Sequence, residues 1–139
     1  MEMDYEPIDH TADAGFRVRG VTLPALFENA ARCLCEAVSV TEGVAASAEH
    51  AVELRADDVA ALLRAWLSEV LYVSYVKHLV LTCATVDEVT EGHLRARLCG
   101  AEYDEARHER HPEIKAVTWH DLAVTRLAEG WEAVFIVDL

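Results

Sequence analysis

The sequence predicts an α+β domain in which two amphipathic helices pack on one face of a largely antiparallel sheet. Three observations predict this fold class: two stretches with helical apolar spacing, several strand-like segments in the second half, and glycine turns that join those strands. The chain has 139 residues, of which 53% are hydrophobic, which suits one globular domain with a substantial core. We therefore expect a single domain over residues 1–139.

Two segments have the features of amphipathic helices. The first is expected from about residue 23 to residue 38, with Thr22 as its N-cap and Pro24 in the first turn, where a missing N–H is tolerated. The second begins after Asp57 and Asp58, whose charges suit a helix N-terminus, and runs to about Tyr75. Its apolar residues share one face: Val59, Leu62, Leu63, Trp66, Leu67 and Val70.

The other expected elements are strands. One lies near the N-terminus at residues 14–18, and a short one lies between the helices at residues 51–56. Four more are expected after the second helix, at residues 79–89, 93–103, 114–127 and 131–137. Glu91-Gly92 and Glu129-Gly130 are expected to form the turns of two hairpins, so the strands within each hairpin are antiparallel.

The charge of the chain limits its function. Twelve Lys and Arg stand against 25 Asp and Glu, a formal net charge of −13. Such a surface repels a phosphate backbone, so we expect no direct nucleic-acid binding, and any role in RNA metabolism would pass through a partner protein. The same charge favours divalent cations and basic partner surfaces.

The sequence also bears on the compartment. The longest mostly apolar stretch, residues 66–80, is interrupted by polar side chains and is too short to span a bilayer, and the acidic N-terminus lacks the apolar core of a signal peptide. We therefore expect a cytoplasmic protein without a membrane partner. The four cysteines, Cys33, Cys35, Cys83 and Cys99, are then expected to be reduced thiols.

Residues 9–13 read DHTAD and place four polar side chains within five positions beside a predicted strand. The ordinary explanation is a turn in which Asp and Thr side chains bond to local backbone groups. The alternative is a ligand site or a catalytic site, with His10 as a candidate base.

A second candidate is the end of the chain, residues 131–139, which read WEAVFIVDL. If this apolar strand is central, it holds Asp138 and the α-carboxylate of Leu139 in place. Two adjacent carboxylates repel each other unless a proton or a cation lies between them. The ordinary explanation is a last strand with a solvated end.

The third candidate is the segment 107–121, RHERHPEIKAVTWHD. Three histidines lie in it (His108, His111 and His120), but neighbouring arginines make it a poor zinc site. Lys115 lies between apolar neighbours in a predicted strand, where an outward-facing lysine on an edge strand is common. The sequence contains no Gly-rich phosphate loop and no nucleophile elbow.

Five segments in this order resemble the archease family: YEPIDHTADAGFRVRG, TLPALFENAA, LLRAWLSEVLY, HPEIKAVTWHDLAV and VFIVDL. The similarity covers essentially the whole chain, and the DHTAD and KAVT segments are its most specific parts. Ala14-Gly15 stands where the family often has Val-Gly, and residues 105–110 cannot be matched residue by residue.

The resemblance implies a metal site made by Asp13, Asp138 and the carboxylate of Leu139. Three hard oxygen donors suit Ca²⁺ or Mg²⁺ and leave positions for water or a partner's ligand. Three other residues of the first segment are expected to brace the turn around this site: Asp9, His10 and Thr11.

Archeases act with RtcB-type RNA ligases, which join tRNA halves and other broken RNA ends. The resemblance therefore implies an accessory protein, without a reaction of its own, that promotes guanylylation and multiple turnover of such a ligase in tRNA splicing or RNA repair. Lys115 matches the lysine of the family's K-A-[IV]-T segment and would act in activating the partner. Two alternatives stay open: a small metal-dependent hydrolase that uses Asp13 and His10, and a general protein chaperone or modulator.

Overall fold

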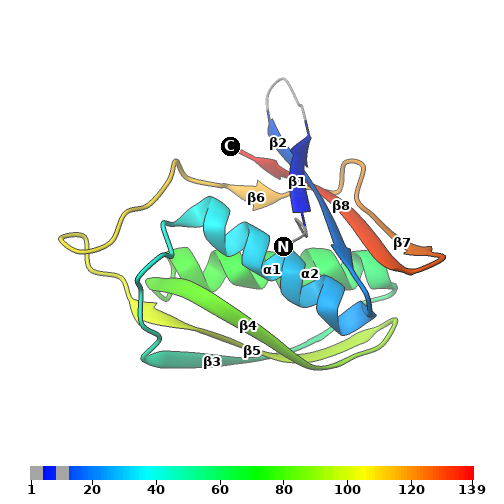
Figure 1. The fold of residues 1–139 in the computed structure, drawn as a ribbon, viewed down its shortest axis with the longest axis horizontal. Helices are drawn as coiled ribbons and strands as arrows, with labels where there is room; N and C mark the ends of the chain where they lie inside the picture. The colour runs from blue at the N-terminus through cyan, green and yellow to red at the C-terminus, as the bar shows by residue number, and fades with distance from the viewer. Residues whose placement is uncertain (1–4, 9–12) are drawn as a thin grey trace.

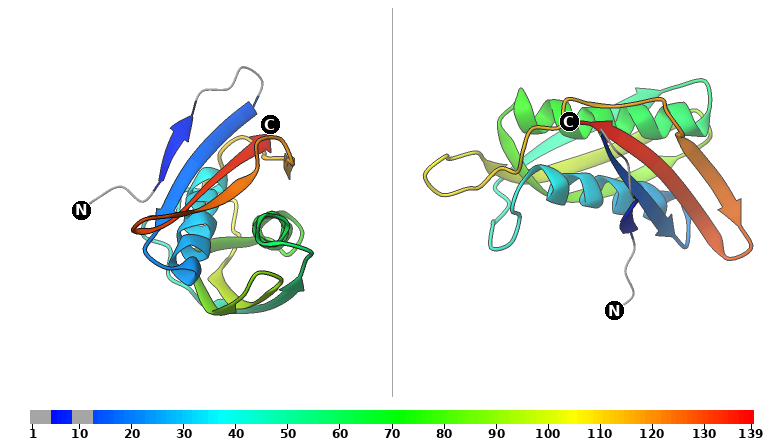
Figure 2. Two further views of the ribbon diagram at one scale, coloured as in Figure 1. Left: turned by 90° about the vertical axis from the view of Figure 1, so that its right-hand side faces the viewer. Right: turned by 90° about the horizontal axis from the view of Figure 1, so that it is seen from above.

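The computed structural model describes residues 5–8 and 13–139. Two helices, α1 (Leu23–Val38) and α2 (Val59–Tyr75), lie between two antiparallel sheets (Figures 1 and 2). The expectations for Asp9, His10 and Thr11 fall outside the described residues. The α+β class, the antiparallel pairing and the two packed helices are confirmed.

The strands are divided between the two sheets. One sheet has the order β3 (Ala48–Arg55), β5 (His93–Glu102), β4 (Leu79–Val89). The other has the order β1 (Tyr5–Ile8), β2 (Asp13–Gly20), β8 (Gly130–Asp138), β6 (Ala116–Val117), and β7 (Ala123–Leu127) also pairs with β8. The last strand of the chain is therefore central in its sheet, with β2 on one side and β6 and β7 on the other.

Both helices begin where the sequence predicts. The Thr22 side chain accepts a hydrogen bond from the N–H of Ala25 at 3.2 Å, and the Asp58 carboxylate accepts one from the N–H of Ala61 at 2.8 Å. Each cap satisfies a backbone donor that lacks a partner within the helix. Neither helix in the described ranges has the length and apolar character needed to cross a membrane.

The core lies where the helices meet both sheets. Trp66 of α2 and Phe27 of α1 are fully buried, and the indole N–H of Trp66 donates to the carbonyl of Phe27 at 2.9 Å. On the other side of the helices, Phe135 of β8 is buried and stacks on Phe16 of β2, with ring centroids 5.3 Å apart. This packing anchors the β2–β8 pair and so fixes the positions of its end residues.

The prediction of one strand over residues 114–127 is wrong. The structure has two short strands there, β6 and β7, separated by a turn in which Asp121 has a φ of 53° and Leu122 donates to the carbonyl of Trp119. The left-handed backbone at Asp121 breaks the extended conformation, and aspartate tolerates it better than most residues. Lys115 consequently precedes a two-residue edge strand instead of lying inside a long one.

The expectation of four reduced cysteines is wrong for one pair. Cys83 of β4 is opposite Cys99 of β5, and the two form a disulfide with a Cα–Cα distance of 5.2 Å. Side chains directly opposite each other on antiparallel strands lie within reach of such a bond. Cys33 and Cys35 are free and buried in α1, where burial raises the pKa of Cys33 and brings that of Cys35 to about 12, so both stay as thiols.

Candidate functional site

The two aspartates predicted to bind metal lie side by side. Asp13 begins β2 and Asp138 ends β8, and the antiparallel register places them directly opposite each other. The same register pairs Phe16 with Phe135 and Val18 with Ala133, which pack toward the helices. Because side chains alternate along a strand, Asp13 and Asp138 project from the opposite face of the sheet, away from the helices.

Leu139 follows Asp138 directly, and Leu139 is 48% exposed. Its position is restricted by its neighbours, because Phe135, Ile136 and Val137 in β8 are fully buried. Figure 1 shows the end marked C beside β6 and at the same end of the sheet as the start of β2. The three predicted metal-binding residues therefore occupy one corner of the five-stranded sheet.

Lys115 reaches the same corner through its backbone. Its N–H donates to the carbonyl of Asp138 at 2.8 Å, and the next residue, Ala116, is the register partner of Asp138. The exposed Lys115 side chain lines a groove against α2 instead. None of the ion pairs among the described residues joins Lys115 to Asp13 or Asp138.

The arrangement has a definite electrostatic character. Residues opposite each other in an antiparallel pair have Cβ atoms about 4.5–5.5 Å apart, a spacing at which ionised carboxylates of Asp13 and Asp138 would repel each other. A cation between them relieves this repulsion, and carboxylate oxygens are the donors that Ca²⁺ and Mg²⁺ prefer. Within the described residues, no group of three or more His, Cys, Asp and Glu is placed to hold a metal.

The histidines of segment 107–121 have local roles. The ring of His108 accepts a hydrogen bond from the N–H of Asp104 at 2.9 Å, and the backbone N–H of His111 donates to the carbonyl of Val38. The backbone N–H of His120 donates to the hydroxyl of Thr118, and its ring lies 3.3 Å from the carboxylate of Asp121. These contacts hold turns and loops in place.

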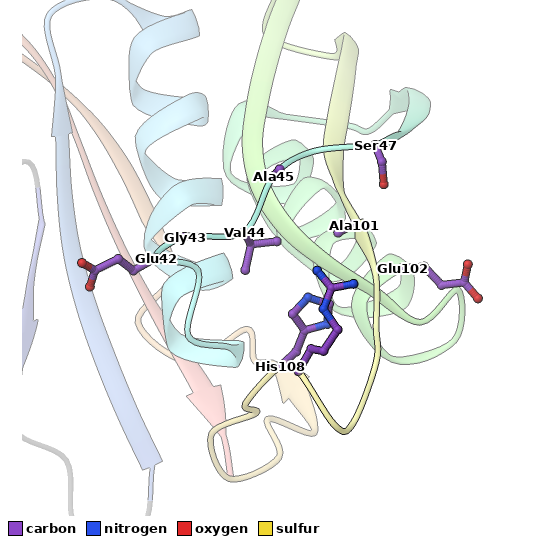
Figure 3. Close-up of a pocket in the computed structure, with 9 residues that line it drawn as sticks. Glu42, Gly43, Val44, Ala45, Ser47, Ala101, Glu102 and His108 are labelled. Carbon is purple, nitrogen blue, oxygen red and sulfur yellow. The ribbon is translucent and has the colours of Figure 1, made fainter.

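A hollow of about 440 Å³ lies between the loop around residues 42–47, the end of β5, and residues 107–108. Figure 3 shows the ring of His108 pointing into it, while the carboxylates of Glu42 and Glu102 point away. The ring also stacks on Tyr103, with centroids 6.2 Å apart. The hollow contains none of the residues predicted to bind metal or to act on a partner.

A second concavity, of about 340 Å³, is lined by α2 and the segment 113–117, and we call it the α2 groove. Its helical side consists of Arg64, Ser68, Leu71, Tyr72, Tyr75 and Val76. The sequence interpretation did not single out these residues, although their spacing places them on one helix face. That helical spacing was the available sequence signal, and the structure adds that Tyr72 and Val76 are exposed.

The comparisons with known proteins cover nearly all of the chain. The family model described as "Archease protein family (MTH1598/TM1083)" matches residues 5–139. A protein archease from Methanosarcina mazei is 37% identical over 97% of this chain and 95% of its own length. A protein archease from Methanosarcina barkeri is 35% identical with the same coverage.

Solved structures agree with this match. The solution structure of Methanobacterium thermoautotrophicum protein 1598 is 36% identical, covers 98% of this chain and 99% of its own, and superposes with a TM-score of 0.83. The crystal structure of a Thermotoga maritima archease, described as a possible chaperone, is 19% identical, covers 96% of each chain and has a TM-score of 0.67, which bears on the fold. The family match and these identities establish that the chain belongs to the archease family.

Proposed function

We propose that this protein is a metal-binding accessory protein that activates an RtcB-type RNA ligase in tRNA splicing or RNA repair. The observation that supports it most is the pairing of Asp13 with Asp138 across the β2–β8 register, next to Leu139. Residues from opposite ends of the sequence thereby present oxygen donors at one exposed corner. The identification of the ligase as the partner comes from the resemblance to archeases.

The donor set fits a hard divalent cation. The carboxylates of Asp13 and Asp138 and the α-carboxylate of Leu139 would hold Ca²⁺ or Mg²⁺, which accept six or more oxygen ligands and so keep positions for water or for a group of the partner. Asp138 and Leu139 are exposed, so a large partner has access to this corner. A bound cation would bring positive charge to an otherwise acidic surface, where it could attract an anionic group of the partner.

An activation assay tests the function. Adding the protein with Ca²⁺ or Mg²⁺ to the cognate ligase should increase ligase guanylylation and the number of RNA ligations per ligase molecule, measured by gel electrophoresis of labelled RNA. The isolated protein should neither hydrolyse generic phosphoester substrates nor prevent aggregation of an unrelated unfolded protein. Phosphoester turnover would support the hydrolase alternative, and suppressed aggregation without ligase stimulation would support the chaperone alternative.

Replacing Lys115 with Met is expected to remove most of the ligase stimulation and leave the fold intact. The side chain is exposed, and substitutions at such positions usually change the free energy of unfolding by no more than about 0.5 kcal/mol. Urea denaturation measures the stability and the ligation assay measures the stimulation. Arg126→Met, an exposed cation in β7, is the matched control and should keep full stimulation. Unfolding of Lys115→Met, or full stimulation by it, would contradict a role in activation.

A further inference from the structure

The α2 groove has a wall on each side and an apolar floor. One wall is a face of α2 from Arg64 to Tyr75 with the C-cap Val76, and the other is the segment 113–117, which includes Lys115. The buried Leu71, Ile114 and Val117 contribute to its lining. At about 340 Å³ the concavity is at the small end of ligand-binding sites, which measure about 300–1,000 Å³.

Arg64 is held in one orientation inside this groove. Its Nε donates to the carbonyl of Val117 at 2.9 Å, and its guanidinium carbon lies 4.4 Å from the centroid of the Trp119 ring. Among the described residues, Arg64 donates a hydrogen bond through Nε, so the two Nη groups can face a ligand. A guanidinium positioned in this way can bind a carboxylate through two parallel hydrogen bonds at little entropic cost.

Large apolar and aromatic side chains along the groove and beside Arg64 are exposed. Trp119 is 62% exposed, Val76 is 58% exposed and Tyr72 is 44% exposed. Tryptophan, tyrosine and arginine are the residue types that contribute most to binding energy at protein interfaces. Their association with a concavity distinguishes this surface from isolated exposed apolar residues, which are common on any protein.

The charge of the groove is opposite to that of the molecule. Arg64 and Lys115 line it, and the ammonium of Lys77 lies 5.9 Å from the centroid of the groove-lining Tyr72 ring. Glu113 is the acidic residue among the lining residues. Two basic residues and one acidic residue therefore line the groove, and Lys77 adds a further positive charge beside it, in a chain whose net charge is −13.

We propose that the α2 groove binds an acidic segment of the partner protein, in which an aromatic or aliphatic side chain is flanked by carboxylates. The apolar side chain would lie against Tyr72 and Val76, and a carboxylate would pair with the Nη groups of Arg64. This inference rests on the proposed function, because it identifies the partner as the RtcB-type ligase. It adds a docking surface that is separate from the carboxylate corner.

A protein segment fits this surface better than RNA. Aromatic rings and an arginine can also stack on bases, but single-stranded RNA needs a positive surface that follows several consecutive phosphates. Here the groove is a local basic site in a chain with a net charge of −13, so phosphates beyond the groove would meet net negative charge. A short acidic peptide segment carries only a few negative charges, and all of them can lie within the groove.

The groove also lies next to the carboxylate corner. Lys115 lines the groove with its side chain and bonds to the carbonyl of Asp138 with its backbone N–H. Ala116, which also lines the groove, is the register partner of Asp138. A segment bound in the groove would therefore hold the partner beside Asp13 and Asp138.

Calorimetric titration of the cognate full-length ligase tests the proposal. Arg64→Glu should weaken binding at least about tenfold, because it replaces the cation that meets the carboxylate with a like charge. Arg126→Glu is the matched control, since Arg126 lies 5.5 Å from the centroid of Trp131 in the β7–β8 hairpin, away from β6 (Figure 1), and it should bind like the wild type. Tyr72→Ser, which changes an exposed side chain, should also weaken binding and guards against misfolding of the charge-reversal variant.

Photo-crosslinking identifies the bound segment. A benzoylphenylalanine at position 72 should capture a ligase peptide rich in Asp and Glu, and the same probe at Leu127, which is 38% exposed in β7, should not capture it. A captured segment that is basic or uncharged would overturn the proposal. Tight binding of single-stranded RNA that is lost in Arg64→Glu would overturn it as well.

The outcomes separate this proposal from the proposed function. Stimulation of the ligase by the wild type, together with unchanged binding by Arg64→Glu and Tyr72→Ser, would exclude the groove and leave the function standing. Failure of the wild type to bind or stimulate the ligase would exclude the proposed function and this docking site with it. Weaker binding by the groove variants but not by Arg126→Glu would support both.

Discussion

Extending the chain by two residues beyond Leu139 is expected to weaken Ca²⁺ or Mg²⁺ binding roughly tenfold or more and to remove ligase stimulation. The extension turns the α-carboxylate of Leu139 into a neutral amide, so the proposed site loses one negative charge and one donor group. The added residues would also leave from the corner where Asp13 and Asp138 lie opposite each other, and would obstruct a partner there. Asp138→Asn should weaken cation binding similarly, because it removes a charge with almost no change in shape.

Calorimetric titration of Ca²⁺ and Mg²⁺ measures this effect. An extension of the N-terminus adds the same residues without changing any of the three carboxylates, and Asp57→Asn neutralises an exposed aspartate that precedes α2, so both should bind like the wild type. Removing the cation should lower the melting temperature of the wild type more than that of the extended form, since three carboxylates repel more strongly than two. Equal cation affinities of extended and wild-type protein would exclude Leu139 from the site.

Replacing Arg110 with Ala is expected to lower the free energy of unfolding by about 3 kcal/mol, because hydrogen bonds to a charged group contribute about 1.5–3 kcal/mol each and are not additive. Its guanidinium donates to the hydroxyl of Ser39 at 2.8 Å, to the carbonyl of Ser74 at 2.6 Å and to the carbonyl of Leu79 at 3.3 Å. It also lies over the rings of two tyrosines, Tyr75 and Tyr103, at 5.5 Å and 4.4 Å.

These contacts join the ends of three elements. Ser39 is the C-cap of α1, Ser74 lies in the last turn of α2 and Leu79 begins β4. Helix C-termini carry partial negative charge and carbonyl groups without an intrahelical partner, which a cation satisfies. Burial lowers the pKa of Arg110, which shows that desolvation disfavours its charge, but an arginine still stays protonated at neutral pH. Without Arg110, the buried Ser39 hydroxyl and the two carbonyls would lose their donor.

Urea denaturation followed by circular dichroism measures the loss of stability. Arg110→Lys should recover only part of it, because an ammonium cannot reproduce the planar fork that reaches three acceptors. Arg55→Ala is the control, since that side chain is 76% exposed and its ion pair with Glu53 spans 3.9 Å, so its stability should change by no more than about 0.5 kcal/mol. A loss below about 1 kcal/mol for Arg110→Ala would show that solvent replaces these bonds.

The helices could be read from the sequence because their signals are local. Thr22 and Asp58 each cap a helix by bonding to a backbone N–H three residues further on, and the apolar spacing of α2 lies within one continuous segment. The strand over residues 114–127 could not be predicted correctly, because its break depends on a left-handed Asp121 and on pairing with β8. The disulfide was missed for a similar reason: the register between β4 and β5 brings Cys83 opposite Cys99.

The sequence by itself determined the fold class, the two helices and the types of residue in the candidate site. Carboxylates in DHTAD and VFIVDL are visible without a structure, but their placement opposite each other follows from the β2–β8 register. The α2 groove is likewise determined partly by sequence and partly by tertiary structure. The spacing of its residues from Arg64 to Val76 is helical and can be read from one continuous segment. Only the tertiary structure brings segment 113–117 and Trp119 against that helix face, because long-range strand pairing and core packing position them.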